Sequence, residues 1–221
     1  MSRIIIYGDI HGCLDEWLTL RAKVKADAND REFCVGDLLN KGPKPLETLR
    51  YAQENGVKSV LGNHEEKYLE IAAAAKIGDT IGLERHLATF KKFSPADLDF
   101  LFAMPRSIKV ANLAIVHAGL TNSVDLANLA SEQSQILTRL RYISLGDDYR
   151  FWAELYNGNQ GFVVYGHTPG DVRRDKHAIG IDTGCVYGYS LTAAIFNWHG
   201  KILDVLNVET KSVRAAKEYS K

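Results

Sequence analysis

The sequence has no surplus of charge of either sign and no long apolar run. Lys and Arg together number 27, as do Asp and Glu, so the net charge indicates no nucleic-acid partner and no anionic membrane. No apolar stretch reaches the ~18 residues that a membrane-spanning helix needs, and the residues after Met1 lack the form of a signal peptide. We therefore expect a cytoplasmic protein without a membrane partner. None of these features predicts an oligomeric state.

Cysteine is also scarce, and internal repeats and low-complexity linkers are absent. The three cysteines, Cys13, Cys34 and Cys185, include no Cys-x-x-Cys pair, so neither a disulfide framework nor an oxidising compartment is indicated. Cys13 is either a small packing residue or lies near a functional site. At 221 residues, with 46% apolar and 24% charged residues, the chain suits one globular domain over residues 1–221.

Short apolar runs alternate with helical patterns in the first third of the chain. Pro45 at the start and Gly56 just past the end bound one of these helices. Because strand–helix alternation is typical of parallel pairing, it predicts an α/β layer. The predicted strands cover residues 4–7, 32–35 and 57–61, and the predicted helices cover residues 14–26 and 45–54.

The rest of the chain divides into a helical region and a region rich in strands. Residues 66–104 lack strand patterns and predict a helical subdomain beside the sheet, in which Ser94, Pro95 and Asp97 form a helix start signal. Closely spaced strands in the second half predict an antiparallel second sheet. We expect these strands at 113–116, 162–165, 178–181, 190–197 and 202–208, a helix at 131–140, and a surface helix or frayed end at 211–221.

Polar metal-binding side chains follow five of these strands and stand beside glycines. Carboxylate, amide and imidazole donors without thiolate favour manganese, iron or zinc over calcium. Six donors exceed the four that a structural zinc takes, and they suit two ions that share a carboxylate. The alternative is that such residues merely cap turns. The six residues are Asp9, His11, Asp37, Asn63, His117 and His167.

The order of these motifs resembles that of the calcineurin-like metallophosphoesterases. Within that group, the match is to the phosphoprotein phosphatase superfamily, which includes the bacteriophage lambda protein phosphatase. The resemblance runs from about Arg3 to Val208 and implies a four-layer α/β/β/α sandwich with a helical insertion. The motifs are Gly8-Asp9-Ile10-His11-Gly12, Gly36-Asp37, Gly62-Asn63-His64-Glu65, His117-Ala118-Gly119 and Gly166-His167-Thr168.

The resemblance implies a role for each motif residue. Asp9 and His11 would bind the first of two divalent ions, for which manganese is expected and iron or zinc are the alternatives, and Asp37 would bridge both ions. His64 would protonate the leaving oxygen, and an imidazole suits that task because its pKa lies near neutrality. The remaining ligands, Asn63, His117 and His167, would bind the second ion.

Phosphate also requires positive side chains. The resemblance gives Arg139 this role, with Arg141 as the alternative, because a small shift in the alignment would exchange them. Asn40 replaces the aspartate with which related protein phosphatases orient the catalytic histidine, so we expect His64 to be less basic here. Lys41 replaces an arginine. Its ammonium would bind phosphate as a point charge, whereas a guanidinium forms two parallel hydrogen bonds.

The Asn40–Lys41 form and the sequence Ile181-Asp182-Thr183-Gly184-Cys185 look more like the ApaH-like branch, related to symmetrical diadenosine tetraphosphatase. The expected function is hydrolysis of a phosphoric ester or anhydride by in-line attack of metal-bound hydroxide, with a dinucleoside polyphosphate as substrate. A Ser/Thr or Tyr protein phosphatase is the alternative, followed by a non-catalytic metal-dependent binding module. Polyphosphate and capped RNA also stay open as substrates.

Two tyrosines and three histidines outside the motifs receive no catalytic role. Tyr187 and Tyr189 follow the Asp182 turn and either line the mouth of the site or pack locally. We expect ordinary surface or core positions for His86, His177 and His199.

Overall fold

The computed structural model describes residues 2–77, 84–130 and 133–210. The segment 211–221, for which the sequence predicts a surface helix or frayed end, lies outside the described residues. Among the described residues, no helix combines the length and the apolar character that crossing a bilayer requires. The helices are α1 (Leu14–Val24), α2 (Pro45–Glu54), α3 (Asn63–Ile77), α4 (Glu84–Phe90), α5 (Pro95–Phe102), α6 (Ser134–Arg139) and α7 (Trp152–Leu155).

The first sheet joins the two ends of the described chain and has the strand order β12-β11-β1-β2-β3. The three N-terminal strands are parallel, as their alternation with helices predicts, and β11 lies antiparallel to β1. Its strands are β1 (Arg3–Tyr7), β2 (Arg31–Cys34), β3 (Lys58–Ser59), β11 (Ser190–Asn197) and β12 (Ile202–Glu209).

The second sheet has the order β4-β5-β8-β10-β9, and its three central strands are parallel. The expectation of an antiparallel second sheet that includes residues 190–208 is therefore wrong. The hairpin β11–β12 is antiparallel as expected, but it extends the first sheet instead. The strands of the second sheet are β4 (Ser107–Val110), β5 (Leu113–Val116), β8 (Phe162–Tyr165), β9 (Arg173–Asp175) and β10 (Ala178–Gly180).

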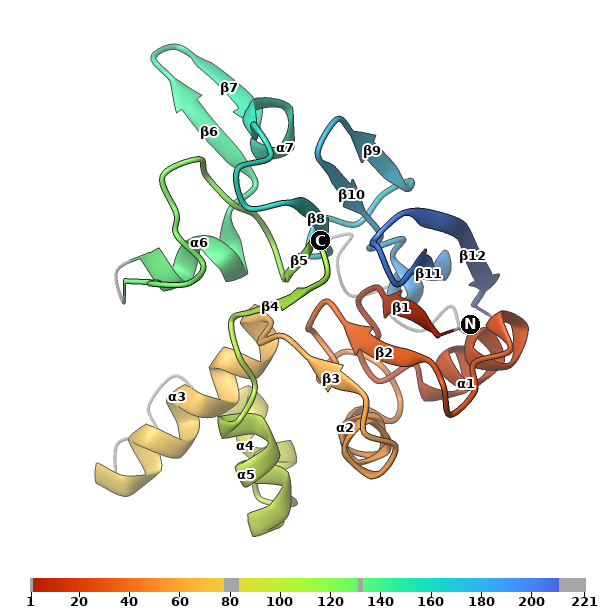
Figure 1. Ribbon diagram of the computed structural model, residues 1–221. Coiled ribbons are helices and arrows are strands. Elements are labelled where there is room, and N and C mark those ends of the chain that lie inside the picture. Colours follow the sequence, from red (N-terminus) through yellow and green to blue (C-terminus); the bar gives the residue numbers. More distant parts are fainter. Residues whose placement is uncertain (1, 78–83, 131–132, 211–221) are drawn as a thin grey trace.

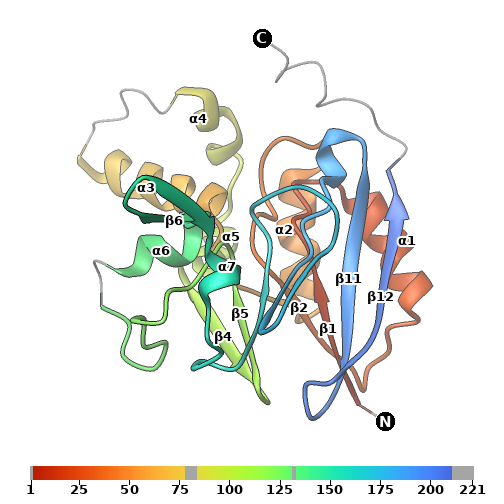
Figure 2. The same ribbon diagram turned by 90° about the horizontal axis from the view of Figure 1, so that it is seen from above.

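The alternation of side chains along β1 shows how the layers form. Ile4 and Ile6 pack with apolar residues of β5, β8 and β10 between the two sheets. Ile5 and Tyr7 face the other way, against Trp17 of α1 and residues of α2. A third cluster joins β5 and β8 to α6 and α7. The result is the expected sandwich of two sheets between helical layers, which is visible in Figures 1 and 2.

A separate hairpin, β6 (Tyr142–Leu145) and β7 (Asp148–Phe151), follows α6 and was not predicted from the sequence. Its strands are mostly exposed, so they lack the buried apolar run by which the other strands are recognised. In Figure 1 the hairpin stands beside α7 and belongs to neither of the two large sheets.

The start signal at Ser94 forms a capping box at the N-terminus of α5. Ser94 Oγ accepts a hydrogen bond from the backbone of Asp97, whose carboxylate accepts in return from the backbone of Ser94. Arg50 adds an ion pair to that carboxylate at 2.8 Å. This network ties α2 to the start of α5.

We expect Ser94→Ala to lower the free energy of unfolding by about 1 kcal/mol, because the helix loses its cap, whereas Ser94→Gly should cost only a few tenths. Urea unfolding measures both changes, and equal losses would contradict the capping role.

Hydrogen bonds from Arg50 hold the pKa of Asp97 below its usual value. This carboxylate therefore stabilises the fold above the unfolded pKa of ~3.9, and its contribution disappears as the pH falls through the folded-state value.

Candidate metal centre and active site

The motif residues meet at one edge of the two sheets. Asp9 and His11 follow β1, Asp37 follows β2, and Asn63 begins α3 directly after the short loop beyond β3. The second sheet contributes His117 after β5 and His167 after β8. Because the carboxyl ends of parallel strands lie at the same edge of a sheet, residues far apart in sequence come within contact distance there.

Backbone conformation is unusual at this edge. Seven described non-glycine residues have a positive φ, and five of them are predicted site residues. Strained backbone of this kind concentrates at functional sites, where neighbouring structure holds it in place. The five residues are His11, Asp37, Asn40, Lys41 and His167.

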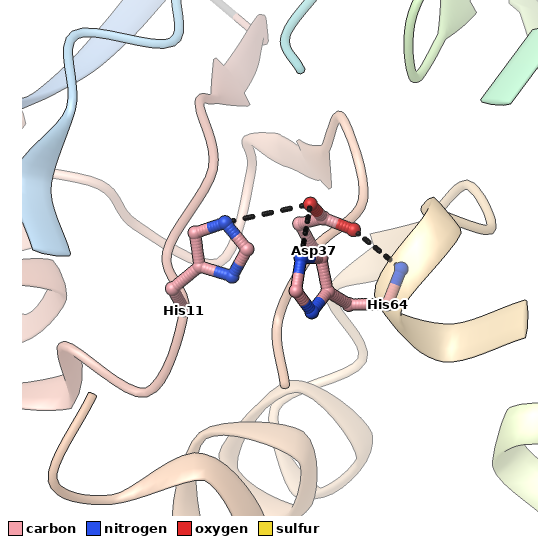
Figure 3. Close-up of side chains that lie close together, drawn as sticks. All are labelled: His11, Asp37 and His64. Atoms are coloured by element: carbon pink, nitrogen blue, oxygen red, sulfur yellow. Dashed lines mark hydrogen bonds and ion pairs between the residues drawn. The ribbon is translucent and has the colours of Figure 1, made fainter. Parts of the chain in front are cut away.

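Asp37 is the central residue of the site. Its Oδ2 atom lies 3.4 Å from His11 Nε2, 3.4 Å from His117 Nε2 and 4.0 Å from His64 Nε2. Figure 3 shows its carboxylate between His11 and His64, whose backbone N–H also donates to Asp37 Oδ1 at 3.1 Å. Gly62 is required beside it, because a Cβ there would collide with Asp37 Oδ1.

Two groups of possible metal ligands share this carboxylate. His11, Asp37 and His64 offer donor atoms that all lie within 4.8 Å of one another, and so do Asp37, His117 and His167. A carboxylate common to two such groups is the arrangement that a pair of ions requires.

Hydrogen bonds orient two of the imidazoles for metal binding. The Nδ1 atom of His11 lies 3.0 Å from the carbonyl oxygen of Leu39, and Nδ1 of His117 lies 2.8 Å from that of Val35. A carbonyl accepts only, so each Nδ1 carries a proton, and each Nε2 faces the site, where it could bind a metal ion once it is free of a proton. Asn63 Oδ1 lies 3.0 Å from His117 Nε2, so these two donor atoms also converge.

Asp9 is buried and binds the other sheet through its carboxylate. Both oxygens accept from the backbone N–H of His167, at 3.2 and 3.1 Å. A Cβ at Gly166 would collide with Asp9 Oδ1, so glycine permits this approach. Asp9 belongs to neither of the two close ligand groups, although its charge acts on His117.

The site concentrates buried negative charge. Burial and the neighbouring Asp182 raise the pKa of Asp9 well above its ordinary value. Burial likewise raises the pKa of Asp182 to about 6 and that of Glu65 to about 7, with the charge of Asp37 adding to both. Burial also acts on Asp37, but the surrounding histidines lower its pKa well below the ordinary range. Carboxylates that repel one another in a buried site favour bound cations.

His64 is held by a chain of hydrogen bonds from α3 and the loop after β2. The Tyr68 hydroxyl donates to Asn40 Oδ1, so the amide nitrogen of Asn40 faces His64 Nδ1, at 2.8 Å. An amide N–H donates, so Nδ1 accepts and the proton of a neutral His64 resides on Nε2, facing Asp37. Burial lowers the pKa of His64 to about 4, an effect that Lys41 reinforces and Asp37 opposes.

Lys41 places a positive charge at the same edge. Its Nζ lies 2.9 Å from His11 Nε2 and donates to the Tyr187 hydroxyl at 2.8 Å. The ammonium thus occupies the side of His11 on which a metal ion would bind, as a stand-in cation. Of the two tyrosines expected either at the mouth or in local packing, Tyr187 contacts the site through Lys41, and Tyr189 is 69% exposed.

The two candidate phosphate-binding arginines lie in different surroundings. Arg139, at the end of α6, donates to Glu66 Oε2 at 3.0 Å, a carboxylate that Arg106 also binds. Arg141 lies two residues further on, and its Nη2 donates to the carbonyl oxygen of His167 at 3.2 Å. The charge of Arg141 also lowers the pKa of His167, after burial and His117. Of the two arginines, Arg141 is the one that contacts a proposed metal ligand, His167.

Glu65 and Asp182 are site residues that the sequence did not reveal. The Glu65 carboxylate accepts from the backbone N–H groups of Asp37 at 2.7 Å and Leu39 at 3.0 Å, and thereby fixes the loop that carries Asp37. Asp182 accepts from the Gly184 N–H at 3.0 Å. The only indication of such a role in the sequence is that Glu65 ends the motif Gly62-Asn63-His64-Glu65 and that Asp182 lies in Ile181-Asp182-Thr183-Gly184-Cys185.

The other residues considered from sequence belong to neither of the two ligand groups that share Asp37. The three cysteines are buried and free, and Cys13 packs in the core beside α1. His86 packs edge-on against Tyr68, and His177 packs against Tyr156.

Known proteins resemble this chain over most of its length. The sequence profile described as Calcineurin-like phosphoesterase matches residues 2–204. An asymmetrical bis(5'-nucleosyl)-tetraphosphatase of Bacillus velezensis is 30% identical over 247 aligned positions, covering 97% of this chain and 93% of that protein. A symmetrical bis(5'-nucleosyl)-tetraphosphatase of Neisseria meningitidis is 34% identical over 162 positions, covering 69% of this chain and 55% of that protein.

A solved structure shows the same similarity in three dimensions. The crystal structure of a candidate diadenosine tetraphosphatase superposes with a TM-score of 0.77 at 28% sequence identity, and the match covers 94% of this chain and 93% of that one. The similarities in sequence and in structure thus extend over most of the chain.

Proposed function

Because the chain belongs to the calcineurin-like phosphoesterase family, whose profile spans residues 2–204, we propose that it hydrolyses a phosphoanhydride bond of a dinucleoside polyphosphate. The observation that carries the proposed chemistry is the position of Asp37, which is common to two groups of possible metal ligands. The substrate follows from the relative of nearly equal length, which is named a bis(5'-nucleosyl)-tetraphosphatase.

The residues present fit two divalent ions, for which we propose manganese. Asp9, His11 and Asp37 would hold the first ion. Asp37 would also hold the second ion, together with Asn63, His117 and His167. Such a pair supplies a nucleophilic hydroxide at neutral pH and neutralises charge on the phosphoryl group. The mixed oxygen and imidazole donors and the excess of buried carboxylates both favour this occupancy.

The protein's own groups position the phosphates and the leaving oxygen. Lys41, held by the Tyr187 hydroxyl, provides one positive charge. His64 presents its Nε2–H on the side of Asp37, and Asn40 keeps the ring in that tautomer. With a pKa of about 4, His64 acts near neutral pH mainly as a hydrogen-bond donor. A phosphate leaving group needs less protonation than an alkoxide, so this weak acid suits an anhydride.

We propose Arg141, rather than Arg139, as the arginine that binds phosphate. Arg141→Ala should lower kcat/KM for the dinucleotide by about 10- to 100-fold, the effect of losing charged hydrogen bonds. Arg141→Lys should lower kcat/KM by an intermediate amount, because lysine keeps the positive charge but cannot form two parallel hydrogen bonds to phosphate. Arg139→Ala should have the smaller effect, since Arg139 is paired with Glu66. Steady-state kinetics of the three variants decide the matter, and the reverse ranking would restore Arg139.

We further propose asymmetric cleavage and a cytoplasmic location. The relative that matches along 93% of its length is an asymmetrical enzyme, whereas the symmetrical enzyme is matched along only 55%. Asymmetric attack by water on diadenosine tetraphosphate gives ATP and AMP, and symmetric attack gives two ADP.

The free, buried cysteines support the proposed cytoplasmic location, because they fit a reducing compartment.

The proposed function is tested by turnover of the manganese-loaded protein on four substrates: diadenosine tetraphosphate, a phosphoserine peptide, a phosphotyrosine peptide and p-nitrophenyl phosphate. We expect the highest kcat/KM for the dinucleotide, with ATP and AMP as products. Faster turnover of either peptide would instead identify a protein phosphatase. Two ADP as products would retain the substrate class and overturn the asymmetry.

A further inference from the structure

A small aromatic pocket opens next to the proposed metal centre. Its volume is about 220 Å³, below the ~300–1,000 Å³ of pockets that take a whole drug-sized ligand. We call it the hairpin pocket, because Tyr142 and Phe151 of the β6–β7 hairpin form one wall. The rest of its lining comes from Tyr165 of β8, the segment Thr168–Asp171, Arg173 of β9 and Gly180 of β10.

Two residues that line the hairpin pocket directly follow proposed site residues in the chain. Thr168 of its lining directly follows His167, a proposed ligand of the second ion. Tyr142 directly follows Arg141, the proposed phosphate-binding residue, whose guanidinium contacts the His167 carbonyl. A substrate whose phosphates lie on Arg141 therefore has this pocket beside it.

The walls suit an uncharged flat ring rather than a phosphate. The rings of Tyr142 and Phe151 meet edge to face with centroids 5.7 Å apart, and Tyr142 is 57% exposed. The guanidinium of Arg173 covers the Phe151 ring at 4.1 Å. Its charge is already engaged by Asp175 at 3.0 Å and Glu154 at 2.8 Å. Arg173 is therefore a wall of the pocket, and the exposed ring of Tyr142 is available for stacking.

The pocket also holds a polar group without a partner. Tyr165 is 2% exposed, and its hydroxyl makes no hydrogen bond to any described residue. Gly180 admits the end of this ring, because its hypothetical Cβ would lie 2.8 Å from the Tyr165 hydroxyl oxygen. Buried hydroxyls are normally paired, so an unpaired one in a pocket lining points to a ligand that completes it. Asp171, also in the lining, adds an acceptor.

We propose that the hairpin pocket binds one nucleobase of the substrate, stacked on Tyr142, with Tyr165 and Asp171 bonding to its edge. This inference rests on the proposed dinucleotide substrate. Adenine matches the polar groups, because it carries an amino donor for Asp171 and ring-nitrogen acceptors for the Tyr165 hydroxyl.

The kinetic test compares variants of the hairpin in the manganese-loaded protein. The measured quantity is the ratio of kcat/KM for diadenosine tetraphosphate to kcat/KM for p-nitrophenyl phosphate, a substrate with no base. Tyr142→Ala should lower this ratio about 10-fold or more, the effect of losing one base–aromatic stack, and Tyr142→Phe should keep it. Leu145→Ala is the control, since Leu145 is an exposed residue of the same strand outside the pocket.

A second variant separates ligand binding from structural support. Tyr165→Phe removes a hydroxyl that has no partner among the described residues, so the melting temperature should not fall. The KM for the dinucleotide should nevertheless rise severalfold. A lower melting temperature with an unchanged KM would assign the hydroxyl to the fold and overturn its role in the pocket.

Direct titration with adenosine distinguishes this inference from the proposed function. Adenosine should bind the wild type and Tyr142→Phe alike, and Tyr142→Ala at least 10-fold more weakly. If adenosine binds in this way but the dinucleotide is not cleaved, the proposed function fails and the base pocket stands. If the dinucleotide is cleaved and Tyr142→Ala leaves the ratio unchanged, the pocket fails alone. A loss confined to the phosphotyrosine peptide would assign the pocket to a peptide ring and overturn the proposal.

Discussion

Replacing Asp37 by Asn should lower kcat/KM for the dinucleotide by about 10³-fold or more, equivalent to ~4 kcal/mol of transition-state stabilisation. The reason is that Asp37 alone belongs to both ligand groups, so its loss weakens both ion sites together. Asn retains the shape of the side chain but lacks the charge and one ligand oxygen. Steady-state kinetics at saturating manganese measures the loss.

A readout independent of activity is the melting temperature as a function of manganese concentration. Ions that bind only the folded chain raise its stability in proportion to the logarithm of their concentration. The wild type should therefore show a clear rise, and Asp37→Asn a much smaller one. The matched control is Asp30→Asn, because Asp30 is another buried carboxylate, paired with Arg3 at 2.5 Å. If Asp37→Asn kept the full response to manganese, the bridging role would be wrong.

Replacing His64 by Asn should retain both ions and lower turnover in a way that depends on the leaving group. We expect a loss of about 10- to 100-fold for a phosphoserine peptide, the effect of losing a hydrogen bond to a charged leaving oxygen. The loss should be smaller for p-nitrophenyl phosphate and for the dinucleotide, whose leaving groups are weaker bases. The structure supports this role, because Asn40 directs the Nε2–H of His64 toward Asp37 and leaves no free lone pair there for a metal.

Two measurements keep this assignment testable. Metal content of His64→Asn, determined by elemental analysis, should equal that of the wild type, and the loss of one ion would make His64 a ligand. Asn40→Asp supplies a carboxylate at the His64 ring and should raise the pKa of the imidazole. Turnover of the phosphoserine peptide should then rise relative to the dinucleotide. If the ratio of the two turnover rates did not change, Asn40 would not control the acidity of His64.

The sequence predicted which residues meet at the sheet edge because they lie in local motifs. Asp9, His11 and Asp37 each come within four residues of the end of a buried strand, so the position of the strand also gives the approximate position of the expected ligand. The parallel β1, β2 and β3 and the helices between them were predictable for the same reason, since their patterns are local and periodic.

Partners that come from elsewhere in the chain were not predictable. The apolar run of β11 predicts a strand but not which sheet it joins, and it pairs with β1 rather than with the second sheet. Glu65 acts by accepting backbone N–H groups of another loop, an interaction that leaves no pattern in sequence. The choice between Arg139 and Arg141 depends on where α6 ends, and helix ends are uncertain by one or two residues.

The most direct test of the dinuclear centre is a crystal structure of the manganese-loaded protein, with the ions located by anomalous scattering. We predict two manganese ions at the sheet edge, roughly 3.5–4 Å apart, with the Asp37 carboxylate bonded to both. Asp9 and His11 should complete one ion site, and Asn63, His117 and His167 the other. A single ion, or two ions that do not share Asp37, would contradict the dinuclear centre on which the proposed hydrolysis depends.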